Sequence, residues 1–183
     1  MPAPKYVPHY TVADYSQWEG EWELWCGIAV SMSPSPFGSH QKLVTKLSHR
    51  FVSALEHRGC DDCQVVAELD WIVSEETIVR PDLSIVCGSD LLRFIDKPPV
   101  LIVEVFSDST KHKDQTSKYT LYEQQGVKYY ILADPVSSIY EAFELHDGVY
   151  QSMPIGSEMK FELQSDCCVE VQLPSDGAQR SPP

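Results

Sequence analysis

Two short acidic segments have residue types and a spacing that could do chemistry. They are Arg80-Pro81-Asp82-Leu83 and Val103-Glu104-Val105, and each places one carboxylate in a stretch with the character of a buried strand. An ionised carboxylate among Val, Leu and Ile is costly unless its charge is compensated. A divalent cation shared by Asp82 and Glu104 would compensate both charges. Lys118, further along the chain, could complete such a site.

These residue types suit the hydrolysis of a phosphodiester. Asp82 and Glu104 would anchor Mg²⁺ or Mn²⁺, with the backbone carbonyl of Val105 as a further ligand. Lys118 would orient or deprotonate the attacking water and contact the phosphate. Simpler interpretations stay open: Asp82 as an ordinary carboxylate at a strand end, and Lys118 as an i, i+4 partner of Asp114 on a solvated helix face.

The elements that must position these side chains begin with a helix. An apolar residue recurs every fourth position from Leu43 to Leu55, after Ser39 as a possible cap and before Gly59. This spacing predicts a helix from Ser39 to about Arg58, with its apolar stripe in the core.

Strands account for most of the remaining pattern. We predict a hairpin in 21–33 turning at Cys26-Gly27, strands at 64–73, 77–87, 100–106, 128–133 and 169–173, a helix at 114–125, and a hairpin at 139–153 turning at Asp147-Gly148. This order predicts an α/β (α+β) class with a mixed central sheet flanked by helices. We expect a single domain over residues 1–173 and a disordered tail over 174–183.

Composition limits the surroundings of the protein. No apolar run reaches the length of a membrane span and no signal peptide is evident, so we expect a cytoplasmic protein without a membrane partner. The six cysteines are expected to be reduced and incidental, although Cys60 and Cys63 have the spacing of a zinc half-site. The formal net charge of −13 argues against broad nonspecific adhesion to nucleic acid.

The order of elements and the acidic residues resemble the restriction-endonuclease-like superfamily, which carries the motif PD-(D/E)-x-K. Pro81-Asp82 matches the first half and Glu104 the second acidic position, whereas Phe106 stands where the lysine is expected. The chain is more closely similar to the bacterial Uma-two family, whose members are described as restriction endonucleases. This similarity covers roughly residues 18–173 and is carried by Pro81-Asp82, residues 103–110, Asp114-x-x-x-Lys118, Leu121-Tyr122, residues 126–130, Trp22-Glu23-Leu24 and His40.

The Uma-two resemblance implies particular roles for the site residues. It places the catalytic lysine on the following helix, as Lys118, and it puts Glu23 and His40 beside the site. From the residues alone, Glu23 could be a surface charge and His40 an exposed residue of the first helical turn. Ser107 could contact phosphate or metal-bound water, or only cap the next helix.

The function implied is that of a Mg²⁺-dependent DNA endonuclease acting as a homodimer. The aromatic segment around Trp18, Trp22 and Trp25 is a candidate dimer surface, and Lys111-His112-Lys113 a candidate phosphate contact. A catalytically weak binding or regulatory module with a nuclease fold is the alternative, favoured by the net charge. Hydrolysis of another phosphodiester stays open as well, because the same metal site would suit it.

Overall fold

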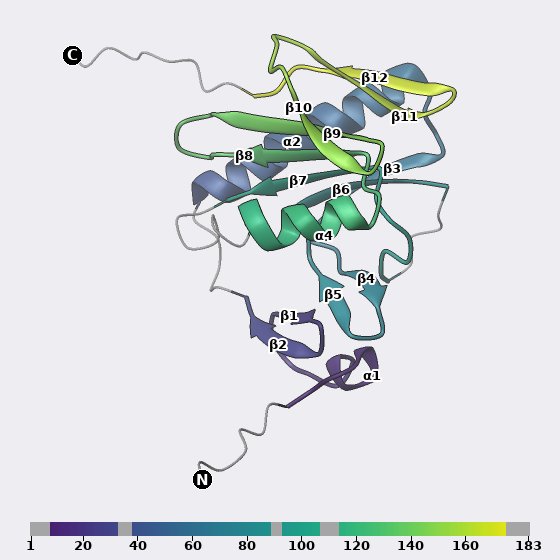
Figure 1. Cartoon of the computed structure of the whole chain (residues 1–183). Helices are drawn as coiled ribbons and strands as arrows, with labels where there is room; N and C mark the ends of the chain where they lie inside the picture. The colour runs from purple at the N-terminus through teal and green to yellow at the C-terminus, as the bar shows by residue number, and fades with distance from the viewer. Residues whose placement is uncertain (1–7, 33–37, 89–92, 107–113, 175–183) are drawn as a thin grey trace, which may run out of the picture.

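The computed structural model describes residues 8–32, 38–88, 93–106 and 114–174. A six-stranded sheet forms its centre, with strand order β10-β9-β8-β7-β6-β3 (Figure 1). The strands are β3 (Cys63–Ala67), β6 (Leu83–Cys87), β7 (Leu101–Val105), β8 (Tyr129–Ala133), β9 (Tyr140–His146) and β10 (Val149–Met153). Strands β7 and β8 are parallel and the other neighbours antiparallel, so the predicted mixed central sheet is confirmed.

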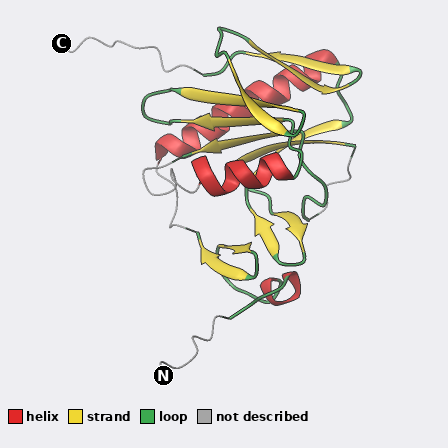
Figure 2. Cartoon of the chain, viewed as in Figure 1, coloured by secondary structure: helices red, strands yellow, loops and turns green. Residues whose placement is uncertain are grey.

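Helices α2 (Gly38–Arg58) and α4 (Tyr119–Gln124) cover opposite faces of this sheet (Figure 2). The apolar stripe from Leu43 to Leu55 is buried, which confirms the predicted helix and its orientation. Successive side chains of β7 enter different cores, as the period of a strand requires. Val103 packs in the α2 core, which the hairpin β11 (Met159–Gln164)–β12 (Cys167–Val171) also covers, and Ile102 packs in the core beside Tyr122 of α4.

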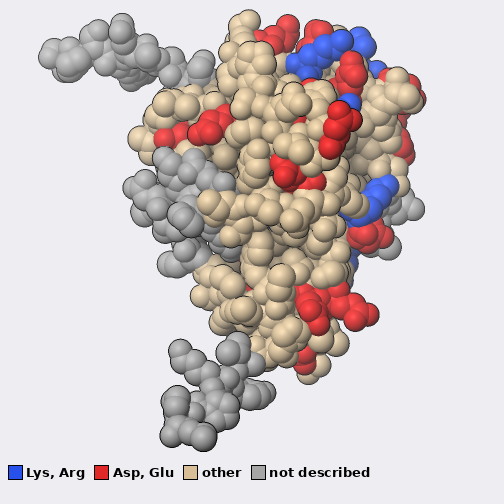
Figure 3. Space-filling view, viewed as in Figure 1, with Lys and Arg blue, Asp and Glu red and all other residues tan. Residues whose placement is uncertain are grey.

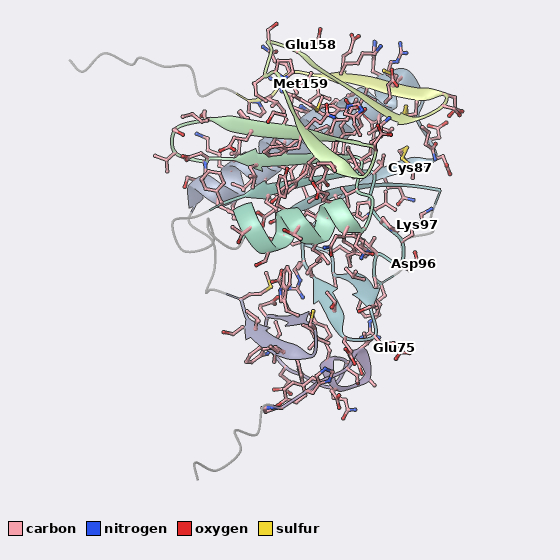
Figure 4. All side chains as sticks on the ribbon, in the orientation of Figure 1. Glu75, Cys87, Asp96, Lys97, Glu158 and Met159 are labelled. Carbon is pink, nitrogen blue, oxygen red and sulfur yellow. A yellow bond between two sulfur atoms is a disulfide. The ribbon has the colours of Figure 1, made fainter. Side chains whose placement is uncertain are left out.

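A second, four-stranded sheet has the order β2-β1-β5-β4 and lies below the central sheet in Figure 1, with helix α1 (Val12–Tyr15) beside it. Its strands are β1 (Trp22–Trp25), β2 (Ile28–Ser31), β4 (Trp71–Ser74) and β5 (Thr77–Val79). Figure 4 labels Glu75 at the outer turn between β4 and β5. The predicted hairpin at Cys26-Gly27 is confirmed, because both residues have positive φ, 47° and 78°.

The two long strands predicted at 64–73 and 77–87 are wrong in extent. Each divides into two strands that belong to different sheets: β3 and β4 from the first, β5 and β6 from the second. Glu68 leaves the strand conformation at φ 52°, which turns the chain out of the central sheet. Pro81 has no N–H to donate to a strand ladder, so strand pairing is interrupted between β5 and β6, where the chain returns to the central sheet.

The helix predicted at 114–125 is present in two parts. It begins as a π-helical turn, η1 (Asp114–Lys118), and continues as α4. Such turns are uncommon and are often found at functional sites. The predicted strand at 169–173 corresponds to β12, whereas β11 was not predicted. Among the described residues, no helix is long and apolar enough to cross a membrane.

The expectation of reduced, incidental cysteines is wrong for four of the six. Cys60 and Cys167 form a disulfide that ties the end of α2 to β12, and Cys63 and Cys87 form another between the neighbouring strands β3 and β6. The Cys60–Cys63 spacing therefore serves two separate bridges and no zinc half-site. Disulfides are typical of oxidising compartments and do not favour the cytoplasmic location expected from the sequence. That location therefore stays a prediction.

Candidate active site

Strand register brings the two carboxylates together. Leu83 of β6 pairs with Val103 of antiparallel β7. One residue further out, Asp82 therefore stands opposite Glu104, and residues directly opposite each other in such a pair point to the same side of the sheet. The sequence separates these residues, and the ladder between β6 and β7 makes them neighbours.

Asp82 is held at the outer end of this pair. Its Oδ2 accepts a hydrogen bond of 2.7 Å from the backbone N–H of Val105 and lies 3.2 Å from Nε2 of His40. The Asp82 side chain is 19% exposed, whereas His40 is buried in the first turn of α2. A carboxylate with fixed partners on one oxygen and access to solvent can present its remaining lone pairs to a ligand.

Glu104 lies deeper, at 1% exposure, and two donors meet on one of its oxygens. Lys118 Nζ is 2.7 Å from Oε1 of Glu104, and the hydroxyl of Tyr122 donates to the same oxygen at 2.7 Å. Lys118 comes from η1 and Tyr122 from the first turn of α4, so the helix that covers this face supplies both. The ammonium group compensates a carboxylate that would otherwise be buried alone.

Glu23, on β1 of the four-stranded sheet, connects that sheet to the candidate site. Its Oε1 lies 3.5 Å from Lys118 Nζ and accepts the backbone N–H of Arg80 at 3.1 Å, while its Oε2 accepts the indole N–H of Trp25 at 2.9 Å. Lys118 Nζ also lies 3.5 Å from the carbonyl oxygen of Arg80. Lys118 is 5% exposed and stands between two buried carboxylates, Glu23 and Glu104.

The side chain of Arg80 fastens the segment that carries Asp82 to the second sheet. Its Nε lies 2.6 Å from Asp70 Oδ1, and its Nη1 forms an ion pair with Glu21. The hydroxyl of Tyr15 donates to Asp70 Oδ2 at 2.9 Å. Burial raises the pKa of Asp70 and the charge of Glu23 raises it further, while the hydrogen bond from Tyr15 opposes both effects.

The structure brings together Asp82, Glu104, Lys118, Glu23 and His40 and corrects the simpler interpretations of three of them. Lys118 is buried in an ion pair and is not on a solvated helix face. Glu23 is buried and not a surface charge, and His40 is buried and not an exposed helical residue. Ser107 and the patch Lys111-His112-Lys113 lie outside the described residues.

Two contributors were missed by the sequence reasoning. Tyr122 entered only as part of the motif that resembles the Uma-two family, and Trp25 only as part of a candidate dimer surface. Both donate to site carboxylates, and Trp25 is partly buried. A signal for Trp25 was present, because it lies two residues after Glu23 and so shares its side of β1.

The protein offers few ligands for a metal at this site. Within the described part of the chain, no group of three or more His, Cys, Asp or Glu side chains is arranged to hold an ion. Asp82 and Glu104 are the two carboxylates that stand opposite each other here, and the carbonyl of Val105 is at the same strand end. A cation bound here would take its other ligands from water or substrate.

We predict that the folded protein resists ionisation of Tyr15 and Tyr122. Burial raises the pKa of Tyr122 well above 10 and that of Tyr15 to about 12. The phenols of the unfolded chain ionise from about pH 10, whereas that of folded Tyr15 stays neutral until about pH 12. The contribution of this neutral phenol to folding stability is therefore lost as the pH rises from about 10 to about 12. Phenolate absorbance should therefore develop fully only when the fold is lost, and ordinary titration of all nine tyrosines before unfolding would contradict this.

The fold defines a mixed α+β domain with a six-stranded central sheet. The fold is similar to a crystal structure from Anabaena variabilis described as "a putative nuclease belonging to DUF820". The two have a TM-score of 0.67 and 14% sequence identity, and the match covers 85% of this chain and 90% of the other. At this identity the likeness concerns the fold alone. The comparison with curated proteins gave no match.

The family follows from the sequence match. Residues 12–174 match the family Uma2, which is described as "Putative restriction endonuclease". The chain belongs to this family, and the resemblance predicted from its motifs is confirmed.

Proposed function

We propose that the protein is a Mg²⁺- or Mn²⁺-dependent DNA endonuclease that hydrolyses phosphodiester bonds, with Asp82, Glu104 and Lys118 as its active-site residues. One observation carries this proposal: the ion pair of 2.7 Å between Lys118 Nζ and Glu104 Oε1. It puts a lysine on the second acidic residue of the motif even though Phe106 occupies the usual lysine position. Membership of Uma2 supports the reaction class.

The donor set fits magnesium. Mg²⁺ is usually held by one or two carboxylates and keeps several positions for water and phosphate. Asp82, Glu104 and the Val105 carbonyl would hold it, and all three are hard oxygen donors at one strand end. When bound, the metal would stabilise charge on the phosphoryl oxygens and lower the pKa of a water ligand.

The protein's own groups would orient the reaction. Lys118 is fixed between Glu104, Glu23 and the Arg80 carbonyl, so its ammonium would meet the attacking water and the phosphate from a set position. His40 and Tyr122 are positioning residues. His40 contacts the Asp82 carboxylate and Tyr122 donates to that of Glu104, and each fixes an orientation.

A binding or regulatory module with weak catalysis is the second candidate. One observation favours it: Lys118 already compensates Glu104, so the buried carboxylate does not require a metal. Titration with Mg²⁺ or Mn²⁺ separates the candidates, because the endonuclease must bind the ion at millimolar concentration and the module need not.

The Asp82→Asn variant tests the endonuclease. We expect wild-type protein to cleave plasmid DNA only with Mg²⁺ or Mn²⁺, and the variant to cleave about 10²–10³-fold more slowly, because it loses an anionic ligand. Asp147→Asn is the matched control, since Asp147 is exposed in the β9–β10 turn. Cleavage that persists in chelator, or an Asp82→Asn rate equal to the control, would overturn the proposal.

A homodimer would suit cleavage of both DNA strands, because it would bring one active site to each strand of the duplex. Trp18 and Trp22 pack against each other within the chain, with ring centroids 5.9 Å apart, and both are partly buried. Sedimentation of the full chain measures the oligomeric state directly.

A further inference from the structure

Helix α2 has the opposite charge to the rest of the chain. It carries Lys42, Lys46, Arg50 and Arg58 against a single acid, Glu56, a formal charge of +3 with its histidines neutral. The whole chain has a formal charge of −13. A local excess of this sign on an acidic protein favours an anionic partner at that surface.

Three of these side chains form a row. Lys42, Lys46 and Arg50 follow one another at intervals of four residues, which places them on one side of the helix. Lys42 and Arg50 are exposed and Lys46 is partly exposed, whereas the residues that face the sheet are buried. Glu56 lies more than a turn beyond the row, so no acid of α2 interrupts it.

The row begins in the same turn of α2 as His40, on a different side of the helix. Lys42 is two residues after His40, whose imidazole contacts the Asp82 carboxylate. The row then runs about 12 Å along the helix axis to Arg50. A DNA duplex advances about 3.4 Å per phosphate of one strand, so this length corresponds to three or four phosphates.

A hollow flanks the start of the row. It has a volume of about 60 Å³ and is lined by Ser39, Lys42, Leu43, Lys46, Pro135, Ser138 and Pro174. Hydroxyl and ammonium groups are the donors that commonly contact the sugar–phosphate backbone without reading its sequence. The hollow therefore adds polar donors next to the first two basic side chains.

Other surfaces suit a polyanion less well. The face over α4 in Figure 3 shows acidic side chains and few basic ones. Most of the basic side chains lie toward the β11–β12 end and the right edge of the view. A larger hollow of about 420 Å³ at the far end of α2 contains His57, Arg58 and Lys160, but Glu158 and Glu170 also line it. The hollow beside Lys42 and Lys46 has no acidic residue in its lining. An acid of another element, Glu68, does reach the first turns of α2, where it accepts a hydrogen bond from Gln41, which is not part of the row.

We propose that Lys42, Lys46 and Arg50, the α2 basic row, bind the phosphate backbone of duplex DNA that flanks the bond held at the active site. This inference rests on the proposed function and deepens it by naming the surface that holds the substrate. The row supplies a local positive surface on a chain whose overall charge of −13 is the main physical objection to a DNA substrate. It carries no sequence information, because ammonium and guanidinium contacts to phosphate occur at every base pair.

The test compares two variants with the same change of charge. The first is Lys42→Gln/Lys46→Gln/Arg50→Gln. The matched control is Lys97→Gln/Lys128→Gln/Lys160→Gln, none of which belongs to α2. Lys160 lines the hollow at the far end of that helix, and Figure 4 labels Lys97 on the connection from β6 to β7. Binding to a short DNA duplex is measured without divalent metal over a series of salt concentrations, so that cleavage plays no part.

We expect the row variant to bind about 10- to 100-fold more weakly than wild type at low salt, and its salt slope to fall by about 2–3, because each lost phosphate contact removes about 0.9. The control should lose much less. Equal binding and slope for the two variants would overturn the proposal, as would wild-type protein that does not bind the duplex. Wild-type protein that binds through the row but never cleaves would support the row and contradict the endonuclease.

Discussion

Replacing Glu104 by Gln should reduce metal-dependent DNA cleavage by about 10²–10³-fold or more while the protein stays folded. Gln keeps the shape of the side chain and an oxygen that can accept from Lys118 and Tyr122, but it removes the negative charge that would bind the cation. Glu23 still lies 3.5 Å from Lys118 Nζ, so the lysine keeps an anionic partner. Single-turnover cleavage of plasmid DNA gives the rate, and thermal unfolding by circular dichroism reports the fold.

Glu141→Gln provides the matched control for this substitution. Glu141 pairs with Leu132, which in turn pairs with Glu104, so it lies in the same row of the central sheet. It is exposed, however, and stands on β9, two strands away from Glu104 on β7. The control should cleave at the wild-type rate. Equal rates for Glu104→Gln and Glu141→Gln, with both proteins folded, would remove Glu104 from the mechanism.

The carboxylate pair was predictable from sequence because its signal is local. Glu104 stands in an almost continuous apolar run, and Pro81-Asp82 immediately precedes another strand. Burial of Glu104 follows from its apolar neighbours alone, and the cost of burying its charge then requires a partner. The helix from Gly38 to Arg58 was predictable for the same reason, since its apolar period is strong and uninterrupted.

The division of the sheets was not predictable, because it depends on pairing between distant segments. Residues 64–73 and 77–87 are apolar enough to continue as strands, and only the turn at Glu68 and the halt at Pro81 send the chain into a second sheet. The role of Glu23 follows from that division. β1 pairs with β5, immediately before Arg80, and so reaches the site.

The partners of the site carboxylates were hidden by a similar ambiguity. An aromatic residue in an apolar pattern is more often a core residue than a hydrogen-bond donor, and Tyr122 is both. The basic row was hidden differently. The sequence drew attention to the dense run Lys111-His112-Lys113, whereas Lys42, Lys46 and Arg50 form a patch only once the helix brings them to one side.

Replacing Lys118 by Met should abolish cleavage and destabilise the fold by about 3–5 kcal/mol, the usual cost of removing one partner from a buried ion pair. Met fills a similar space but leaves Glu23 and Glu104, each 1% exposed, without the cation between them. Tyr122, Trp25 and the Arg80 N–H still donate to these carboxylates, and they compensate only part of the charge. Urea unfolding measures the free energy, provided that the transition is two-state.

The double variant Lys118→Met/Glu104→Gln separates stability from catalysis. Glu104→Gln should destabilise the wild-type background, where it breaks the ion pair, and stabilise the Lys118→Met background, where it removes an uncompensated charge. This reversal of sign is a coupling free energy between the two side chains, of the order of 1–3 kcal/mol. Cleavage should stay lost in the double variant, because a restored fold does not restore the groups that act on water and phosphate. Additive destabilisation would show that the pair at 2.7 Å is not energetically coupled, and cleavage by the double variant would show that neither residue is catalytic.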